Sequence, residues 1–286
     1  MSTPRPDGYR RSLSFEWPER VPWSELGPTF IEMWGRPDGR HDPEHVEITG
    51  QTGSGKTYLL GTLLQQRAEL RGSSEILVAT KAADSTLQQL GWPVVDSWRD
   101  LQRYRQAMYW PRTSKLADER EHHLEDRIFD LLARLWQPDA NTVVAFDEIG
   151  TVEALPGPRG RGKRMQKLIQ QYWREARSHG ITILAMKQRP IGVVRDQHSE
   201  SRWKFVFPPA DRGDVDRFAE LLGAPADWVP VLDDLDQELH EFVVRNSVTK
   251  EAFISWIDTK LRPLPSQSHQ EDRTASEYLY GRRRTQ

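Results

Sequence analysis

The chain has 286 residues, of which 37% are hydrophobic and 29% charged, a composition typical of a globular protein with one large α/β domain or two modest ones. No run approaches the roughly 18 apolar residues of a membrane helix, and no signal peptide opens the chain, so we expect no membrane insertion. The absence of cysteine excludes disulfides and thiolate metal sites. The net charge of −2 excludes a uniformly basic surface, so any contact with nucleic acid requires locally concentrated Arg and Lys.

The pattern of apolar residues divides the chain into a folded centre and two polar ends. Residues 1–20 carry prolines and arginines without apolar periodicity, which predicts a flexible N-terminal segment. The pattern of apolar residues over 21–260 predicts a single folded domain. Residues 261–286 are polar and end in a basic cluster, which predicts a disordered tail.

Short apolar runs alternate with amphipathic segments through the folded centre. The expected strands are 45–48, 75–80, 142–146, 181–186 and 203–207, with a terminal hairpin at 241–245 and 252–257. The expected helices include 58–70, 122–136, 214–222 and one that Gly180 ends. This alternation predicts an α/β fold with a mainly parallel central sheet flanked by helices.

The first strand of this sheet leads into Gly50–Thr57, which reads GQTGSGKT and fits the phosphate-binding pattern G-x-x-x-x-G-K-[ST]. Small residues let the backbone curl so that its N–H groups point at a triphosphate. Lys56 would reach the β- and γ-phosphates, and the Thr57 hydroxyl would bind Mg²⁺. The residues expected to hold ATP are Gly50, Gln51, Thr52, Gly53, Ser54, Gly55, Lys56 and Thr57.

A second nucleotide signature lies at the end of the strand expected at 142–146, where Asp147 and Glu148 follow four apolar residues. A buried strand carries these carboxylates to the edge of the sheet at which the phosphate-binding loop lies. Asp147 can hold Mg²⁺, through water or jointly with Thr57. Glu148 suits a general base that orients or activates the attacking water. The pair therefore predicts ATP hydrolysis.

The order of these motifs resembles the RecA/AAA-type (ASCE) branch of P-loop NTPases. An additional strand precedes the Asp-Glu strand, and the glutamate follows directly on that strand. In this branch a polar side chain at the end of the next strand often senses the γ-phosphate, and Gln188 occupies that position.

The segment Arg174–Pro190, REARSHGITILAMKQRP, resembles the FtsK/HerA superfamily of DNA-translocating ATPases. In that family a helix carrying Arg, then Gly-Ile, leads into a strand ending in Gln-Arg-Pro. Together with Gly50–Thr57 and Asp147-Glu148, the resemblance covers roughly residues 45–222. Lys187 departs from the small hydroxyl residue that usually precedes the glutamine.

The resemblance implies a homo-oligomeric ring, commonly a hexamer, with ATP between subunits and double-stranded DNA in the centre. Each site then needs a cation from the neighbouring subunit to stabilise charge on the phosphoryl group. Arg177 matches the family's arginine three residues before Gly-Ile and is the first candidate for this arginine finger. Arg174 and Arg202 are alternatives.

Basic residues gather between the Asp-Glu strand and the next helix. A positive loop in a pore can follow phosphates without reading sequence, which suits a translocase. The expected DNA contacts are Arg159, Arg161, Lys163 and Arg164.

These features predict an ATPase that translocates double-stranded DNA, with genome packaging or transfer for a virus or mobile element as the favoured role. An ATP-dependent assembly switch and a repair- or segregation-type translocase are the alternatives, and a small-molecule kinase is disfavoured because no acceptor motif appears. We expect a cytoplasmic protein, in the host cytoplasm if the chain is viral. The sequence indicates no particular docking partner.

Overall fold

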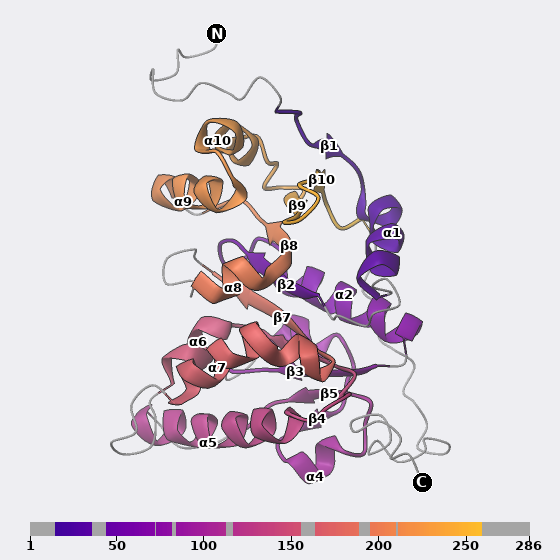
Figure 1. The fold of residues 1–286 in the computed structure, drawn as a ribbon, viewed down its shortest axis with the longest axis vertical. Coiled ribbons are helices and arrows are strands. Elements are labelled where there is room, and N and C mark those ends of the chain that lie inside the picture. The colour runs from indigo at the N-terminus through magenta and orange to yellow at the C-terminus, as the bar shows by residue number, and fades with distance from the viewer. Residues whose placement is uncertain are drawn as a thin grey trace.

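The computed structural model describes residues 15–35, 44–71, 73–81, 84–112, 117–155, 164–188, 195–209 and 211–258. Within these ranges ten strands form one sheet in the order β1-β10-β9-β8-β2-β7-β6-β3-β5-β4 (Figure 1). The strands are β1 (Glu19–Arg20), β2 (His45–Thr49), β3 (Ser74–Val78), β4 (Val94–Val95), β5 (Gln106–Tyr109), β6 (Thr142–Phe146), β7 (Ile181–Lys187), β8 (Ser201–Val206), β9 (Phe242–Asn246) and β10 (Ala252–Ser255).

The strands from β8 to β4 along this order run parallel, and β9 is antiparallel to both β8 and β10. The carboxyl ends of the parallel strands therefore meet at one edge of the sheet. The strand β7 lies between β2 and β6, so the ends of these three strands are neighbours at that edge.

Helices cover both faces of the sheet because successive strand residues point to opposite sides. One face packs against α1 (Trp23–Gly35), α2 (Lys56–Arg71) and α3 (Ser85–Gln88). The other face packs against α4 (Trp98–Leu101), α5 (Ala117–Leu135), α6 (Ile149–Ala154) and α7 (Arg164–Glu175), and near β8 and β9 against α9 (Arg212–Leu222) and α10 (Pro225–Asp233). A 3-10 turn, η1 (Ala176–His179), joins α7 to β7.

The short helix α8 (Arg195–Glu200) has no apolar residue and packs on polar strand residues. His198 Nδ1 lies 3.3 Å from Glu47 Oε2, and its Nε2 lies 2.9 Å from the carbonyl oxygen of Leu221. Lys204 Nζ donates to the carbonyl of His198 at 2.7 Å. This polar strip, made of Glu47, His198 and Lys204, lies between the apolar clusters beneath α4–α7 and beneath α9–α10.

The structure confirms the α/β fold and the mainly parallel sheet. The expected strands at 45–48, 75–80, 142–146, 181–186 and 203–207 correspond to β2, β3, β6, β7 and β8, and the terminal hairpin corresponds to β9 and β10. None of the helices within the described ranges is both long and apolar enough to cross a membrane.

The structure also corrects some expectations. Within the segment 1–20, expected to be flexible, Glu19–Arg20 pair with β10, because Arg20 binds the carboxylates of Asp234 and Glu241. The strand β5 is not among the strands expected from the sequence, because its four residues are too few to show a periodicity. Residues 1–14 and the expected tail from 261 to 286 lie outside the described residues, so these bounds remain predictions.

Candidate active site

The segment 50–57 forms a tight loop between β2 and α2, as its glycines require. Gly50, Gly53 and Gly55 have φ values of 146°, 81° and 98°, a region that other residues rarely adopt. A Cβ on Gly50 would lie 2.5 Å from the Cβ of Phe207, so a side chain does not fit there. Because α2 begins at Lys56, the free N–H groups of its first turn add to the anion-binding character of the loop.

The Lys56 side chain folds back on this loop. Its Nζ donates to the carbonyl oxygen of Gln51 at 2.5 Å, and the residue is 7% exposed. Burial lowers the pKa of Lys56 to about 8, although the nearby Glu148 opposes this effect. An anion bound in the loop would stabilise the ammonium form, so the site is suited to a phosphate group.

Asp147 is held in one orientation by Thr80 at the end of β3. Its Oδ1 accepts hydrogen bonds from the backbone N–H of Thr80 at 3.1 Å and from the Thr80 hydroxyl at 3.0 Å. Its Oδ2 is buried and has no hydrogen-bond partner among the described residues. Burial raises the pKa of Asp147, and the hydrogen bonds from Thr80 counteract this. Thr80 is a site residue that the sequence analysis missed.

The free Oδ2 of Asp147 fits a role as ligand to Mg²⁺ or to a water of its shell. No cluster of three His, Asp or Glu side chains suited to a metal occurs in the described part of the chain. Mg²⁺ commonly binds one or two protein groups together with phosphate oxygens and water. Thr57, the other expected ligand, is half-buried in the first turn of α2.

Glu148 is the residue before α6, where its side chain makes no capping hydrogen bond. Its Oε1 lies 3.2 Å from the position that a Cβ on Gly150 would occupy, and Lys187 Cε lies 3.5 Å from the same position. Burial raises the pKa of Glu148, as does the adjacent Asp147, while Lys56 and Lys187 act in the opposite direction. Lys187 forms a buried ion pair of 3.4 Å with Glu153 on α6.

The structure brings Gln188 to the same loop. Gln188 follows β7, the strand between β2 and β6, and its Oε1 accepts a hydrogen bond from the Thr52 hydroxyl at 3.3 Å. The phosphate-binding loop, both carboxylates and the candidate sensor therefore lie together at one edge of the sheet.

The candidate arginine fingers lie at the opposite edge. Arg177 precedes β7, whose seven residues span about 20 Å, and its guanidinium lies 3.3 Å from Glu200 on α8. Arg202 pairs with Glu44 at 2.5 Å. Neither arginine is near the loop of its own chain, and each forms an ion pair within the chain.

Arg164, one of the expected DNA contacts, forms an ion pair within the chain. Its guanidinium binds both carboxylate oxygens of the buried Glu125, at 2.6 and 2.7 Å, and lies over the ring of Phe129. Only 23% of its side chain is exposed. It therefore joins α7 to α5. The other expected DNA contacts, Arg159, Arg161 and Lys163, lie outside the described residues.

No protein-family model matches the chain, and no curated protein matches its sequence. Solved structures do resemble it. The genome packaging NTPase B204 from Sulfolobus turreted icosahedral virus 2 is 14% identical with a TM-score of 0.56, over 77% of this chain and 98% of that one. The chain therefore shares the fold of this genome packaging NTPase.

Two further solved structures resemble this chain over only part of their own length. The pCW3 conjugation coupling protein TcpA is 15% identical, with a TM-score of 0.52 over 76% of this chain and 62% of that one. The type VII secretion ATPase EccC of Thermomonospora curvata is 18% identical, with a TM-score of 0.55 over 79% and 26%. At these identities the likeness shows the fold alone, and the chemistry must be argued from the side chains of this chain.

Proposed function

We propose that this chain is the subunit of an ATP-hydrolysing ring that translocates double-stranded DNA. The observation that carries the proposal is the convergence of Lys56, Asp147, Glu148 and Gln188 at one sheet edge, with Asp147 Oδ2 buried and unpartnered among the described residues. The fold supports it, since the packaging NTPase B204 has been solved with AMPPCP and with ATP-gammaS.

The roles in hydrolysis follow from the positions of the side chains. The N–H groups of the loop and Lys56 bind the phosphates. Thr57 and Asp147 would hold Mg²⁺, which supplies positive charge to the β- and γ-phosphate oxygens. Glu148 accepts the proton of the attacking water, and its raised pKa favours this role. Gln188, bonded to Thr52, detects whether the terminal phosphate is present.

The ring and its DNA contacts rest on the resemblance and on the position of the arginines. Arg177 would leave Glu200 and stabilise the transferring phosphoryl group of the next subunit, with a hexamer as the proposed assembly. Arg159, Arg161 and Lys163 would contact the DNA backbone. Among DNA motors, genome packaging is favoured because the likeness spans nearly all of the packaging NTPase B204.

The test is ATP hydrolysis with and without long duplex DNA. We expect DNA to stimulate turnover by the wild-type protein, while Glu148→Gln binds ATP but turns over about 10²- to 10⁴-fold more slowly. Asp130→Asn, on the exposed side of α5, serves as the control and should behave as wild type. If duplex DNA does not change the rate of hydrolysis, an assembly switch is favoured. If Glu148→Gln turns over ATP at the wild-type rate, Glu148 is not the general base.

A further inference from the structure

The loop between α10 and β9, residues 234–241, lies beside the phosphate-binding loop on the side away from the catalytic carboxylates. β9 pairs with β8 in antiparallel register, so this α10–β9 loop arrives at the sheet edge where β2 ends. His240 Cβ lies 3.4 Å from the position that a Cβ on Gly55 would occupy, and a ring carbon of Phe207 lies 3.5 Å from it.

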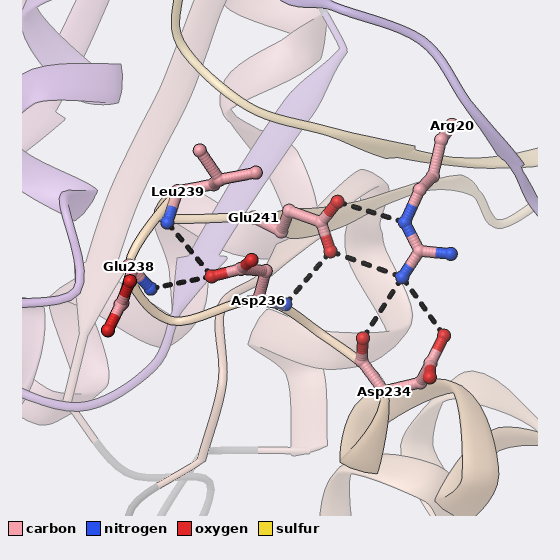
Figure 2. Close-up of polar contacts among 6 residues, drawn as sticks. All are labelled: Arg20, Asp234, Asp236, Glu238, Leu239 and Glu241. Atoms are coloured by element: carbon pink, nitrogen blue, oxygen red, sulfur yellow. Dashed lines mark hydrogen bonds and ion pairs between the residues drawn. The ribbon is translucent and has the colours of Figure 1, made fainter.

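The α10–β9 loop is held rigidly by its own polar contacts, as Figure 2 shows. Asp236 Oδ1 accepts hydrogen bonds from the backbone N–H groups of Glu238 and Leu239, at 2.8 and 3.1 Å. The buried Glu241 accepts from the backbone N–H of Asp236 and from Arg20, both at 2.9 Å. Arg20 also binds Asp234 at 3.0 Å. These contacts fix the loop before any ligand arrives.

The tip of this rigid loop presents side chains suited to an apolar, flat ligand. Leu239 is 52% exposed and can therefore be reached by a ligand. His240 is exposed and has a φ of 54°, the left-handed region that disfavours residues with a Cβ. A strained, exposed imidazole directly beside a phosphate-binding loop points to a bound group.

The elements on the two sides of the phosphate-binding loop determine which way a bound nucleotide is oriented. Asp147, Glu148 and Gln188 lie on the side of β6 and β7, so the terminal phosphate must point to that side. The nucleoside end then points toward β8 and β9, where the α10–β9 loop lies. We propose that this loop binds the base and ribose of the nucleoside triphosphate, with the His240 ring stacked on the base and Leu239 packed at its edge.

This inference rests on the proposed nucleotide function and adds the residues that distinguish a nucleotide from a bare phosphate chain. The experiment therefore compares the binding of ATP with that of inorganic tripolyphosphate, measured by calorimetry on the full chain. The main variant is His240→Gly, because glycine keeps the left-handed conformation while removing the ring. His240→Phe restores a stacking ring, and Leu239→Ser removes the apolar edge.

We expect His240→Gly to weaken ATP binding by about ten- to a hundred-fold, the usual effect of losing one stacking partner. Tripolyphosphate binding should not change, and His240→Phe should recover most of the ATP affinity. The matched control is Val248→Ser, which removes a 66% exposed apolar side chain from the turn between β9 and β10. It should change neither affinity.

Three outcomes would overturn the inference, and they separate it from the proposed function. If the wild-type protein binds both ligands and His240→Gly leaves ATP affinity unchanged, the α10–β9 loop is not the nucleoside site, although the phosphate-binding loop stands. If His240→Gly weakens the binding of ATP and of tripolyphosphate equally, the α10–β9 loop only supports the conformation of the phosphate-binding loop. Wild-type protein that binds neither ligand would refute both proposals.

Discussion

At the scale of single residues, two adjacent carboxylates at the end of β6 have different contacts, which suit them to the two different roles proposed above. Asp147 is fixed by two hydrogen bonds from Thr80 and keeps one free oxygen. Glu148 has no capping bond and lies beside Lys187. The sequence predicts both carboxylates from the strand that precedes them. It could not predict Thr80 as a partner, because that contact depends on β3 lying next to β6.

A third carboxylate, Glu75 on β3 between β6 and β5, makes folding stability depend on pH. It is fully buried, and burial raises its pKa from 4.5 to about 7. Between these values the unfolded chain releases its proton while the folded chain keeps it. Stability attributable to Glu75 is therefore present below pH 4.5 and is lost as pH rises to about 7.

We expect Glu75→Gln, which stays neutral, to be more stable than wild type by about 1–3 kcal/mol at pH 8, with the difference shrinking toward pH 4.5. Denaturant unfolding at both pH values measures this. Glu121→Gln, on the exposed face of α5, should show no such pH-dependent difference. A constant difference for Glu75→Gln at both pH values would mean that its ionisation is not the cause.

At the scale of elements, α6 shows how a helix start can be built for catalysis at some cost in stability. Gly150 is in the first turn of α6, where alanine would favour the helix. A Cβ at this position would lie 3.2 Å from Glu148 Oε1 and 3.5 Å from Lys187 Cε. The glycine therefore leaves the space in which the Glu148 carboxylate lies.

Gly150→Ala is expected to leave the free energy of unfolding unchanged or raise it by up to about 1 kcal/mol, while kcat falls by at least about ten-fold because Glu148 is displaced. ATP affinity should be kept, since the phosphate-binding loop is untouched. Unfolding, ATP binding and turnover can be measured on the same preparation. An unchanged kcat would show that Glu148 reaches its position from another rotamer.

Elements differ in how well the sequence reveals them. Largely apolar runs such as 142–146 and 181–186 predict buried strands. A strand buries every residue only when both faces of its sheet are covered. The strand β5 and the α10–β9 loop carry no local signal, since their positions depend on tertiary contacts. The basic residues within 159–164 predict a DNA contact for Arg164. The sequence could not predict its ion pair with the buried Glu125, because Glu125 lies on another helix.

At the scale of the whole molecule, the proposed ring would complete each site with Arg177 of a neighbouring subunit, because Arg177 lies far from the phosphate-binding loop of its own chain. Glu148 and Arg177 would then act in one site from two different subunits. A chain lacking one residue can still supply the other to its neighbour.

We therefore expect Glu148→Gln and Arg177→Ala proteins to be nearly inactive separately and to regain ATP hydrolysis when mixed. In mixed assemblies an intact Glu148 site can face an intact Arg177. Turnover as a function of the mixing ratio measures this, and mixing Glu148→Gln with Lys56→Ala, which damages the same half of the site, is the control that should stay inactive. If Arg177→Ala alone keeps wild-type turnover, another residue is the finger.

The polar strip beneath α8 has a mechanical consequence for such a machine. On that face the sheet carries two apolar bodies, one on β3, β5, β6 and β7 and the other on β8, β9 and β10, and the contacts between them run through Glu47, His198 and Lys204. Exposing apolar surface to water costs free energy, whereas hydrogen bonds can be exchanged for bonds to water at little net cost. We therefore expect this seam to open under load before either apolar body does, and α8, which bears the Glu200 partner of Arg177, packs on it.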